Sequence, residues 1–262
     1  MREKKVAVID LDSVAFSAGS GNKVLDEYNQ PIRENGRFVY EDKTEEQIAE
    51  SVDYFMKLIL NNVNADSYIA YIKGKGNFRY SINPEYKANR PKDSPKWWAY
   101  TKKCFIENWK AVEVNGIEVD DAVNITRLQI PNSIICAIDK DLLSLEGQHY
   151  NWRKDTIDIV DTAEANRLFW LDMIIGQPGD NIKGLPGKGE KYAEKVFNTE
   201  LIECGVIDLS SVILSEYIKH FGESKGINEF YRNYKSLKIL ESYEGFVIPE
   251  IVEFKKPMEE LF

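Results

Sequence analysis

Short apolar runs alternate with longer amphipathic stretches over the first two-thirds of the chain, which has 262 residues. The runs that predict buried strands lie at 5–10, 67–72, 133–138 and 156–160. The stretches whose apolar positions recur with helical spacing lie at 44–64, 94–113 and 119–129. Strands that alternate with helices predict an α/β fold with a mostly parallel central sheet flanked by helices.

The first two of these helices carry start signals. Thr44 and Gln47 have capping-box spacing at the start of one helix. In the other, Ser94 is a suitable cap and Pro95 takes the first helical position. We therefore expect helices to begin at these two places.

The pattern changes twice along the chain. Residues 21–43 are polar and rich in turn-forming residues, which predicts an inserted hairpin. From Thr162 onward the pattern is mainly helical, with a glycine-rich stretch at 176–189. We therefore predict an α/β core over 1–161 and a mainly helical region over 162–262.

Composition argues against several protein classes. The chain has no apolar run long enough to span a membrane and no apolar signal-peptide region, so a cytoplasmic location without membrane contact is expected. The three cysteines lack metal-ligand spacing and are expected to be reduced thiols. Two histidines are too few to favour a histidine-based zinc site. The net charge of −9 argues against nucleic-acid binding, unless many carboxylates are gathered around bound cations.

Acidic residues follow several predicted strands. They are Asp10 and Asp12, Glu118, Asp120 and Asp121, Asp139 and Asp141, and Asp180 in the turn GQPGDN. Each alone has an ordinary interpretation as a helix cap or turn residue. Together they would repel one another at the carboxyl edge of the sheet, and hard divalent cations remove that cost. The pattern predicts a site for two Mg²⁺ or Mn²⁺ ions that activates water against a phosphodiester.

Five motifs in fixed order carry a resemblance to a known family. They are IDLD (9–12), PEYKANR (84–90), IEVDD (117–121), IDKD (138–141) and GDNIKGLPGKGEK (179–191). This order resembles the flap endonuclease and 5′→3′ exonuclease family, and bacteriophage members most, from about Val6 to about Phe197. The resemblance implies a nuclease core, a helical arch at about 90–113 and a helix–three-turn–helix element. A phage-encoded member would act in the host cytoplasm.

The resemblance also assigns residues to roles. The implied metal ligands are Asp10, Glu118, Asp120, Asp121, Asp139, Asp141 and Asp180, with Asp121 the less certain member of its trio. Asp12 has a counterpart only in some phage members of the family. The implied catalytic residues are Asp10, Lys87, Arg90, Glu118 and Asp139. Lys87 and Arg90 would stabilise negative charge on the scissile phosphate.

DNA binding is expected at two further places. The turn GLPGKGEK combines tight glycine turns with a helix start whose free N–H groups suit phosphate, and the resemblance adds a K⁺ ion there. Its predicted DNA-binding residues are Lys183, Gly187, Lys188, Gly189 and Lys191, together with Arg79, Lys87 and Arg90. The helix at 94–113 places lysines beside Trp97, Trp98, Phe105 and Trp109, which suits a single strand threaded through an arch. Core packing of these aromatic side chains is at least as good an interpretation.

Two positions depart from the family pattern. Ile72 and Gln177 stand where members usually carry aspartate. Losing two carboxylates is expected to weaken metal binding or slow turnover, with Asp12 compensating in part. The C-terminal Leu261 and Phe262 faintly resemble sliding-clamp peptides, although plain packing of the last residues is the favoured interpretation.

The sequence therefore predicts a metal-dependent 5′ nuclease. Its substrates would be DNA with free 5′ ends, flaps or nicks, and RNA in RNA–DNA hybrids is a weaker expectation. A DNA-binding accessory protein with a disabled site and an RNA-cleaving enzyme of related fold are the alternatives.

Overall fold

A seven-stranded sheet organises the computed structural model, which describes residues 4–91, 93–198 and 208–255. The strands are β10 (Thr156–Val160), β9 (Gly147–Asn151), β8 (Ser133–Cys136), β1 (Val6–Asp10) and β6 (Ser67–Lys73) in spatial order, with β7 (Val112–Val114) and β13 (Val252–Glu253) both paired to β6. Strands β1, β6, β7, β8 and β9 are parallel, and only β10 and β13 are antiparallel to their neighbours. The predicted mostly parallel α/β fold is confirmed.

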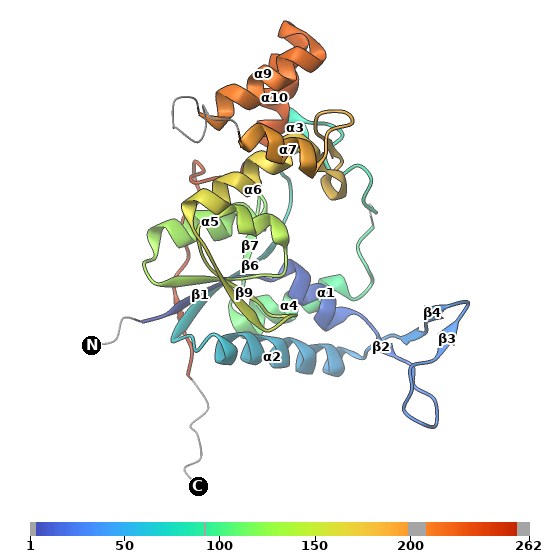
Figure 1. Cartoon of the computed structure of the whole chain (residues 1–262). Coiled ribbons are helices and arrows are strands. Elements are labelled where there is room, and N and C mark those ends of the chain that lie inside the picture. Colours follow the sequence, from blue (N-terminus) through green and yellow to red (C-terminus); the bar gives the residue numbers. More distant parts are fainter. Residues whose placement is uncertain (1–3, 92, 199–207, 256–262) are drawn as a thin grey trace.

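Helices cover both faces of the sheet (Figure 1). Helices α1 (Asp12–Gly19), α2 (Glu45–Asn62) and α4 (Trp98–Trp109) pack together over one face, and α5 (Val119–Gln129) lies on the other. Thr44 caps α2 in a reciprocal capping box with Gln47, as predicted. Burial of the apolar residues on the two faces gives two separate clusters of core side chains, one on each side of the sheet.

The helix predicted at 94–113 is shorter than expected and belongs to the core. Helix α4 begins only at Trp98, and the chain enters β7 after Lys110, whose φ of 52° ends the helix. Trp97 packs edge-on against Phe16, and an added Cβ on Gly19 would lie 2.1 Å from the Trp97 ring. This close packing, not the Ser94–Pro95 signal, fixes where the helix starts.

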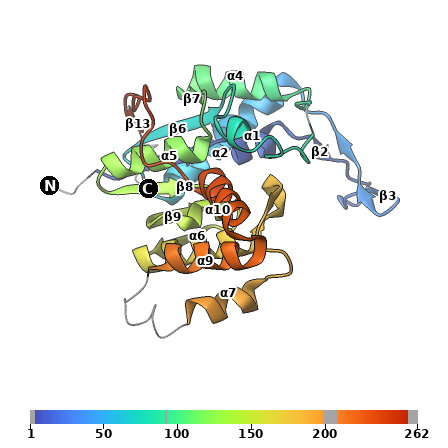
Figure 2. The same cartoon turned by 90° about the horizontal axis from the view of Figure 1, so that it is seen from above.

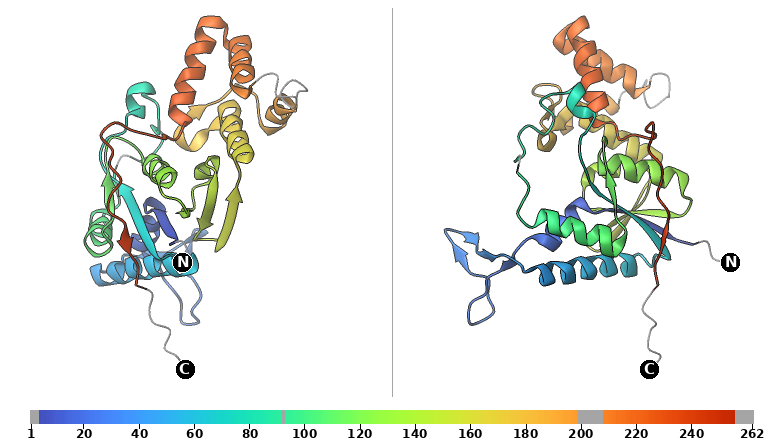
Figure 3. Two further views of the ribbon diagram at one scale, coloured as in Figure 1. Left: turned by 90° about the vertical axis from the view of Figure 1, so that its left-hand side faces the viewer. Right: turned by 180° about the vertical axis from the view of Figure 1, so that it is seen from behind.

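The predicted helical arch is therefore wrong in its bounds and its placement. The chain between α3 (Arg79–Ile82) and α4 runs as turns and extended backbone, within the described residues 83–91 and 93–97, from the helical region down to α4 (Figure 3). Phe105 of α4 is fully buried, and Trp98 and Trp109 pack partly buried against the same cluster, so the interpretation of this aromatic stripe as core packing is confirmed.

Residues 21–43 form the predicted inserted hairpin, which projects away from the sheet (Figure 1). Strand β2 (Asn22–Lys23) pairs with β5 (Tyr40–Glu41), and β3 (Arg33–Glu34) pairs with β4 (Arg37–Phe38).

The helical region follows β10 and has its own core. It contains α6 (Thr162–Ile175), α7 (Glu190–Phe197), α9 (Leu209–Phe221) and α10 (Glu223–Leu237). Helix α6 contacts the other three, α9 and α10 lie side by side, and the four surround a third apolar cluster (Figure 2). After α10 the chain returns to the sheet as β13, so the described residues 238–255 are not helical, contrary to the prediction of a mainly helical region there. The C-terminal Leu261 and Phe262, for which a sliding-clamp contact was considered, lie outside the described residues.

Two small features connect these parts. The short helix η1 (Lys140–Ser144) follows β8, and the ladder of β11 (Gly176–Gln177) with β12 (Ile182–Lys183) encloses the short helix η2 (Pro178–Asp180). No described helix has the length and apolar character needed to cross a membrane.

Candidate active site

The predicted acidic residues meet in one cleft between the carboxyl edge of the sheet and the η2 turn. Strand β1 ends at Asp10, the loop after β8 leads to Asp139, α5 begins after Glu118, and η2 ends at Asp180. The acids that line the cleft are Asp10, Asp12, Glu118, Asp120, Asp139, Asp141 and Asp180. The cleft has a volume of about 610 Å³, which is the size of a small-molecule or nucleotide site.

Backbone N–H groups fix the acids that follow β1 and β8. The Asp12 N–H donates to Asp10 Oδ1 at 2.8 Å, and the Lys73 N–H donates to Asp12 Oδ1 at 2.9 Å. The Asp141 N–H donates to Asp139 Oδ1 at 3.0 Å in the same way. Each pair is therefore held at the start of a helical turn, with further carboxylate lone pairs left for other partners.

Burial and mutual repulsion perturb this group strongly. Burial, and next the charge of Asp12, raise the pKa of Asp10 well above its usual value. Burial, and next the charges of Asp10 and Asp139, do the same to the pKa of Asp120. Burial, and next the charge of Asp139, raise the pKa of Asp141 to about 7. Carboxylates that disfavour their own ionisation in this way are stabilised by a cation.

Two basic residues of the PEYKANR motif enter the same cleft. Lys87 Nζ lies 2.5 Å from Glu118 Oε1 and 3.4 Å from Asp180 Oδ2. Arg90 Nη2 lies 2.5 Å from Asp180 Oδ1. Burial acts to raise the pKa of Glu118, but the charges of Lys87 and Arg79 outweigh it and lower that pKa. The cleft thus brings together both the predicted acids and the predicted phosphate-binding cations.

Tyr86 and Asn77 are site residues that the sequence did not single out. The Tyr86 hydroxyl lies 2.9 Å from both Glu118 Oε2 and Asp180 Oδ2, and bridges the two carboxylates. Asn77 Nδ2 donates to Glu118 Oε1 at 2.8 Å. Tyr86 directly precedes Lys87 in the motif, and this adjacency to a predicted site residue was the only sequence signal for it.

The structure contradicts two of the assigned roles. Asp121 is fully buried, and its two oxygens accept from Arg79 Nη1 at 2.6 Å and Nη2 at 2.8 Å. Arg79 is 2% exposed and also donates to the carbonyls of Ser236 and Lys238. A buried bidentate pair leaves neither group available, so Asp121 is not a metal ligand and Arg79 does not reach DNA. Instead they join α5 to the end of α10.

Ile72 occupies a different environment from the one implied by the family pattern. Its side chain is fully buried in the apolar cluster under α1, α2 and α4, not in the cleft. At this end of β6 the cleft is lined by Lys73, whose N–H holds Asp12.

The Ile72→Asp variant should therefore lose stability and gain no metal affinity. An isolated carboxylate in this cluster is expected to lower the free energy of unfolding by roughly 3–5 kcal/mol. Urea denaturation beside an Ile72→Val control, which should lose about 1 kcal/mol, checks the first part. Unchanged stability together with tighter Mn²⁺ binding would contradict it.

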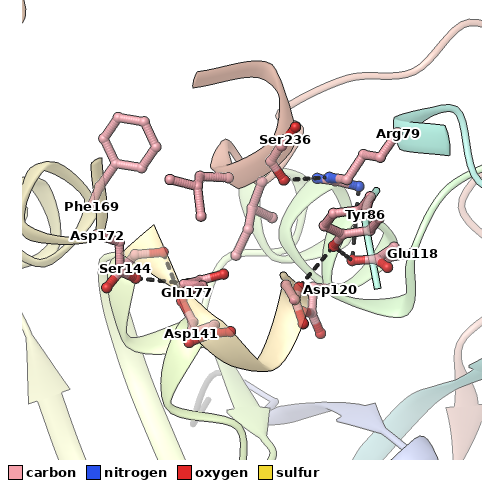
Figure 4. Close-up of a pocket in the computed structure, with 13 residues that line it drawn as sticks. Arg79, Tyr86, Glu118, Asp120, Asp141, Ser144, Phe169, Asp172, Gln177 and Ser236 are labelled. Carbon is pink, nitrogen blue, oxygen red and sulfur yellow. Dashed lines mark hydrogen bonds and ion pairs between the residues drawn. The ribbon is translucent and has the colours of Figure 1, made fainter. Parts of the chain in front are cut away.

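Gln177 holds a further acid, Asp172, next to the cleft. Its Nε2 donates to Asp172 Oδ2 at 2.7 Å, and Asp141, Asp172 and Gln177 gather on one side of a small pocket that adjoins the cleft (Figure 4). Burial raises the pKa of Asp172. Asp172 lies in the last turn of α6, within the predicted helical region, and the sequence offered no sign that it faces the site.

The predicted duplex-binding turn lies beyond β12 and is open to solvent. Gly187 has a φ of 71°, Gly189 is the N-cap residue of α7, and Lys183 and Lys191 are exposed. Lys188 Nζ lies 4.0 Å from the centre of the Tyr192 ring.

The residues of the cleft fit a hard divalent cation in their chemistry. All of the candidate ligands are carboxylate oxygens, and several are buried beside like charges. Among the described residues, no group of three or more His, Cys, Asp or Glu side chains is placed so that it could hold an ion without moving. Lys87 and Arg90 hold Glu118 and Asp180 in ion pairs, and these pairs would have to open for those carboxylates to bind an ion.

The raised pKa values of the cleft acids predict that, without divalent ions, the protein becomes less stable as the pH rises. The folded protein binds protons at Asp10, Asp120 and Asp141 more tightly than the unfolded chain does. Protonation of these three groups therefore adds to the free energy of unfolding at low pH. For Asp141 this stabilisation is lost as the pH rises from the pKa of the unfolded state, 3.8, through the pKa of the folded state, about 7.

In EDTA, the melting temperature should therefore fall between about pH 4 and pH 7 because of these groups. Mg²⁺ or Mn²⁺ should raise it more at the higher pH. Thermal unfolding with and without the ion checks both statements, with Asp141→Asn flattening the slope. Equal stabilisation by the ion at both pH values would contradict them.

Comparisons with known proteins agree with this arrangement. No model of a protein family matches the chain. A 5′-3′ exonuclease of Mycoplasmopsis pulmonis (strain UAB CTIP) is 31% identical over 159 residues, which cover 53% of this chain and 53% of that protein. A DNA polymerase I of Bacillus caldotenax is 25% identical over 220 residues, covering 74% of this chain and 23% of the polymerase. The matches thus span about half or less of these curated relatives.

Solved structures share the fold. A bacteriophage T5 protein co-crystallised with metal ions has a TM-score of 0.63 at 16% identity, covering 91% of this chain and 89% of that one. A T5 flap endonuclease in a pseudo-enzyme-product complex with DNA and metal ions has a TM-score of 0.56 at 14% identity, covering 89% and 99%. The resemblance to the flap endonuclease and 5′→3′ exonuclease family that the motifs indicate is thus confirmed in sequence and in fold.

Proposed function

We propose that the chain is a divalent-metal-dependent 5′ nuclease that hydrolyses DNA phosphodiesters at flaps, nicks or free 5′ ends. The observation that carries the proposal is the gathering of carboxylates from four separate segments in one cleft, beside two cations. Relatives described as a 5′-3′ exonuclease and as a flap endonuclease bound to DNA and metal ions support it.

The acids divide into two groups around the cleft. Asp10 and Asp139 are the two like charges that most raise the pKa of Asp120, and these three acids would hold the first ion. Asp141 and Asp180 would hold the second, with Glu118 between the groups. Mg²⁺ or Mn²⁺ bound there would lower the pKa of an attacking water and neutralise charge on the phosphodiester. Asp12 stands beside Asp10 and adds charge where Ile72 supplies none.

The side chains of this protein would do the positioning. Lys87 and Arg90 would leave their acidic partners and donate to the non-bridging oxygens of the scissile phosphate, where negative charge develops. Tyr86 would hold Glu118 and Asp180 in place as they change partners.

The duplex would lie along the helical region. The turn at 185–189 and the start of α7 offer backbone N–H groups, and Lys183, Lys188 and Lys191 add positive charge along the duplex backbone. A K⁺ ion at this turn is part of the proposal. Because the chain is acidic overall, its DNA affinity should depend on this surface and on bound divalent ions.

The proposal is tested with a 5′-labelled flap and a nicked duplex in Mg²⁺, Mn²⁺ or EDTA. Metal-dependent cleavage near the branch or the 5′ end supports it, and RNA–DNA hybrids in the same assay report on RNA. Tight DNA binding without cleavage in either metal would instead support the accessory protein. That second function is favoured by the lack of carboxylates at Ile72 and Gln177.

A further inference from the structure

Two tight turns from distant parts of the chain interlock directly above the cleft. One is the 85–90 turn, which carries Lys87 and Arg90, and the other is the η2 turn at 178–181. Each contains a residue with left-handed backbone, Lys87 with φ of 55° and Asn181 with φ of 57°. Left-handed non-glycine residues persist where the surrounding contacts fix them, and here the contacts are between the two turns.

Three successive carbonyls of the η2 turn accept from the 85–90 turn. Pro178 O accepts from Asn89 Nδ2 at 2.9 Å, Gly179 O from Arg90 Nε at 3.2 Å, and Asp180 O from the Lys87 N–H at 2.9 Å. In return, Asn181 Nδ2 donates to Glu85 O at 2.8 Å. Four hydrogen bonds that each involve a main-chain carbonyl thus join the turns, separately from the ion pairs of Lys87 and Arg90 with Asp180.

The η2 turn is also joined rigidly to the duplex-binding surface. Strand β12 leads from Asn181 to Lys183, its ladder with β11 closes the turn, and the chain then passes directly into the 185–189 turn and α7. Gly184 packs so closely on the end of α6 that an added Cβ would lie 2.2 Å from Ile174 O. The duplex-binding surface and the two cations therefore belong to one hydrogen-bonded unit.

We propose that Asn89 and Asn181 are positioning residues that set which phosphodiester is cut. Their amides fix the 85–90 turn on the η2 turn, and so fix the distance from the duplex grip to Lys87 and Arg90. The inference rests on the proposed nuclease function. It adds that the position of cleavage is determined by this pair of turns and not by the acids alone.

The test compares Asn181→Gly with a matched control. Glycine keeps the left-handed backbone and removes only the amide. Asn132 is a suitable control because it also has left-handed backbone, with φ of 55°, and donates to Lys4 O at 3.1 Å at the opposite end of β8. Asn132→Gly should leave cleavage unchanged.

The expected result has three parts, measured on one 5′ flap with product lengths resolved to the nucleotide. Asn181→Gly and Asn89→Ala should lower kcat about tenfold with KM within about twofold, because the reacting groups are misplaced and the duplex grip is intact. Their products should spread to neighbouring lengths. Combined with Lys87→Met, Asn181→Gly should cost less than it does alone.

Cleavage by the two variants that matches Asn132→Gly in rate and in product length would overturn the inference while leaving the nuclease proposal standing. The inference would also be overturned if Asn181→Gly lowered kcat by the same factor in the Lys87→Met background as it does alone. Absence of cleavage by the unmodified protein in both metals would instead sink the proposed function. Thermal melting of each variant shows whether folding accounts for any loss.

Discussion

Replacing Asp139 by asparagine is expected to lower flap cleavage by about 10³-fold, because a carboxylate central to the cleft is lost and metal-ion charge stabilisation contributes several kcal/mol. Asparagine keeps an oxygen that can accept the Asp141 N–H, which Asp139 Oδ1 accepts now. The local turn should therefore survive, and melting in EDTA should be unchanged or slightly higher, since a repelling charge is removed from Asp10 and Asp120.

Two measurements separate this explanation from simple misfolding. Mn²⁺ titration by calorimetry should show weaker binding in Asp139→Asn, in parallel with the lost activity. Glu107→Gln, on the exposed surface of α4, is a control that should change neither Mn²⁺ binding nor the rate of cleavage. Cleavage by Asp139→Asn in Mg²⁺ at the rate of the unmodified protein would show that the Asp139 carboxylate is not part of the active site.

The second large effect is expected for Lys87→Met, which should lower kcat by roughly 10²–10³-fold, as when one donor to a developing negative charge is removed. Its Nζ sits between Glu118 and Asp180, and no other lysine among the described residues forms ion pairs with both. DNA affinity at low salt should change by much less, since Lys87 is one phosphate contact among several.

Lys57→Met provides the matched comparison, because Lys57 is an exposed lysine of α2 paired with Asp53. Single-turnover rates and binding constants for both variants are the measurements. If Lys87→Met lost affinity and kept its single-turnover rate, Lys87 would belong to binding and not to the chemical step.

Much of the α/β architecture could be predicted because its signals are local. The strand end that carries Asp10 and the capping box of α2 depend on short stretches of sequence, and the structure has them as expected. Helix α5 has the predicted bounds for the same reason. Strand β8 ends at Cys136, two residues before the predicted end, and Asp139 lies in the loop that follows. Parallel strands then place their carboxyl ends at one edge, which brings the acids together.

The features that could not be predicted depend on contacts between distant residues. Arg79 and Asp121 are assigned to the site in the sequence analysis, yet α10 and the following turn bury them as a structural pair. The start of α4 is set by Trp97 packing on Gly19, which overrides a good cap. Ile72 faces the apolar cluster because its neighbours on β6 fix the strand's alternation.

Asp172 and the interlocked turns were missed for the same reason. A helix-interior aspartate carries no sign of facing Gln177, and Asn89 and Asn181 are 92 residues apart by number. Such contacts belong to the tertiary fold, where the functional roles of single side chains are decided.

A crystal grown in Mn²⁺ would test the central idea most directly, through the anomalous signal of the ion. We predict one or two ions in the cleft, with Asp10, Asp120 and Asp139 among their ligands and Lys87 released from Glu118. A crystal at saturating Mn²⁺ with no ion in contact with these carboxylates, and with Lys87 still paired to Glu118, would contradict the proposed active site.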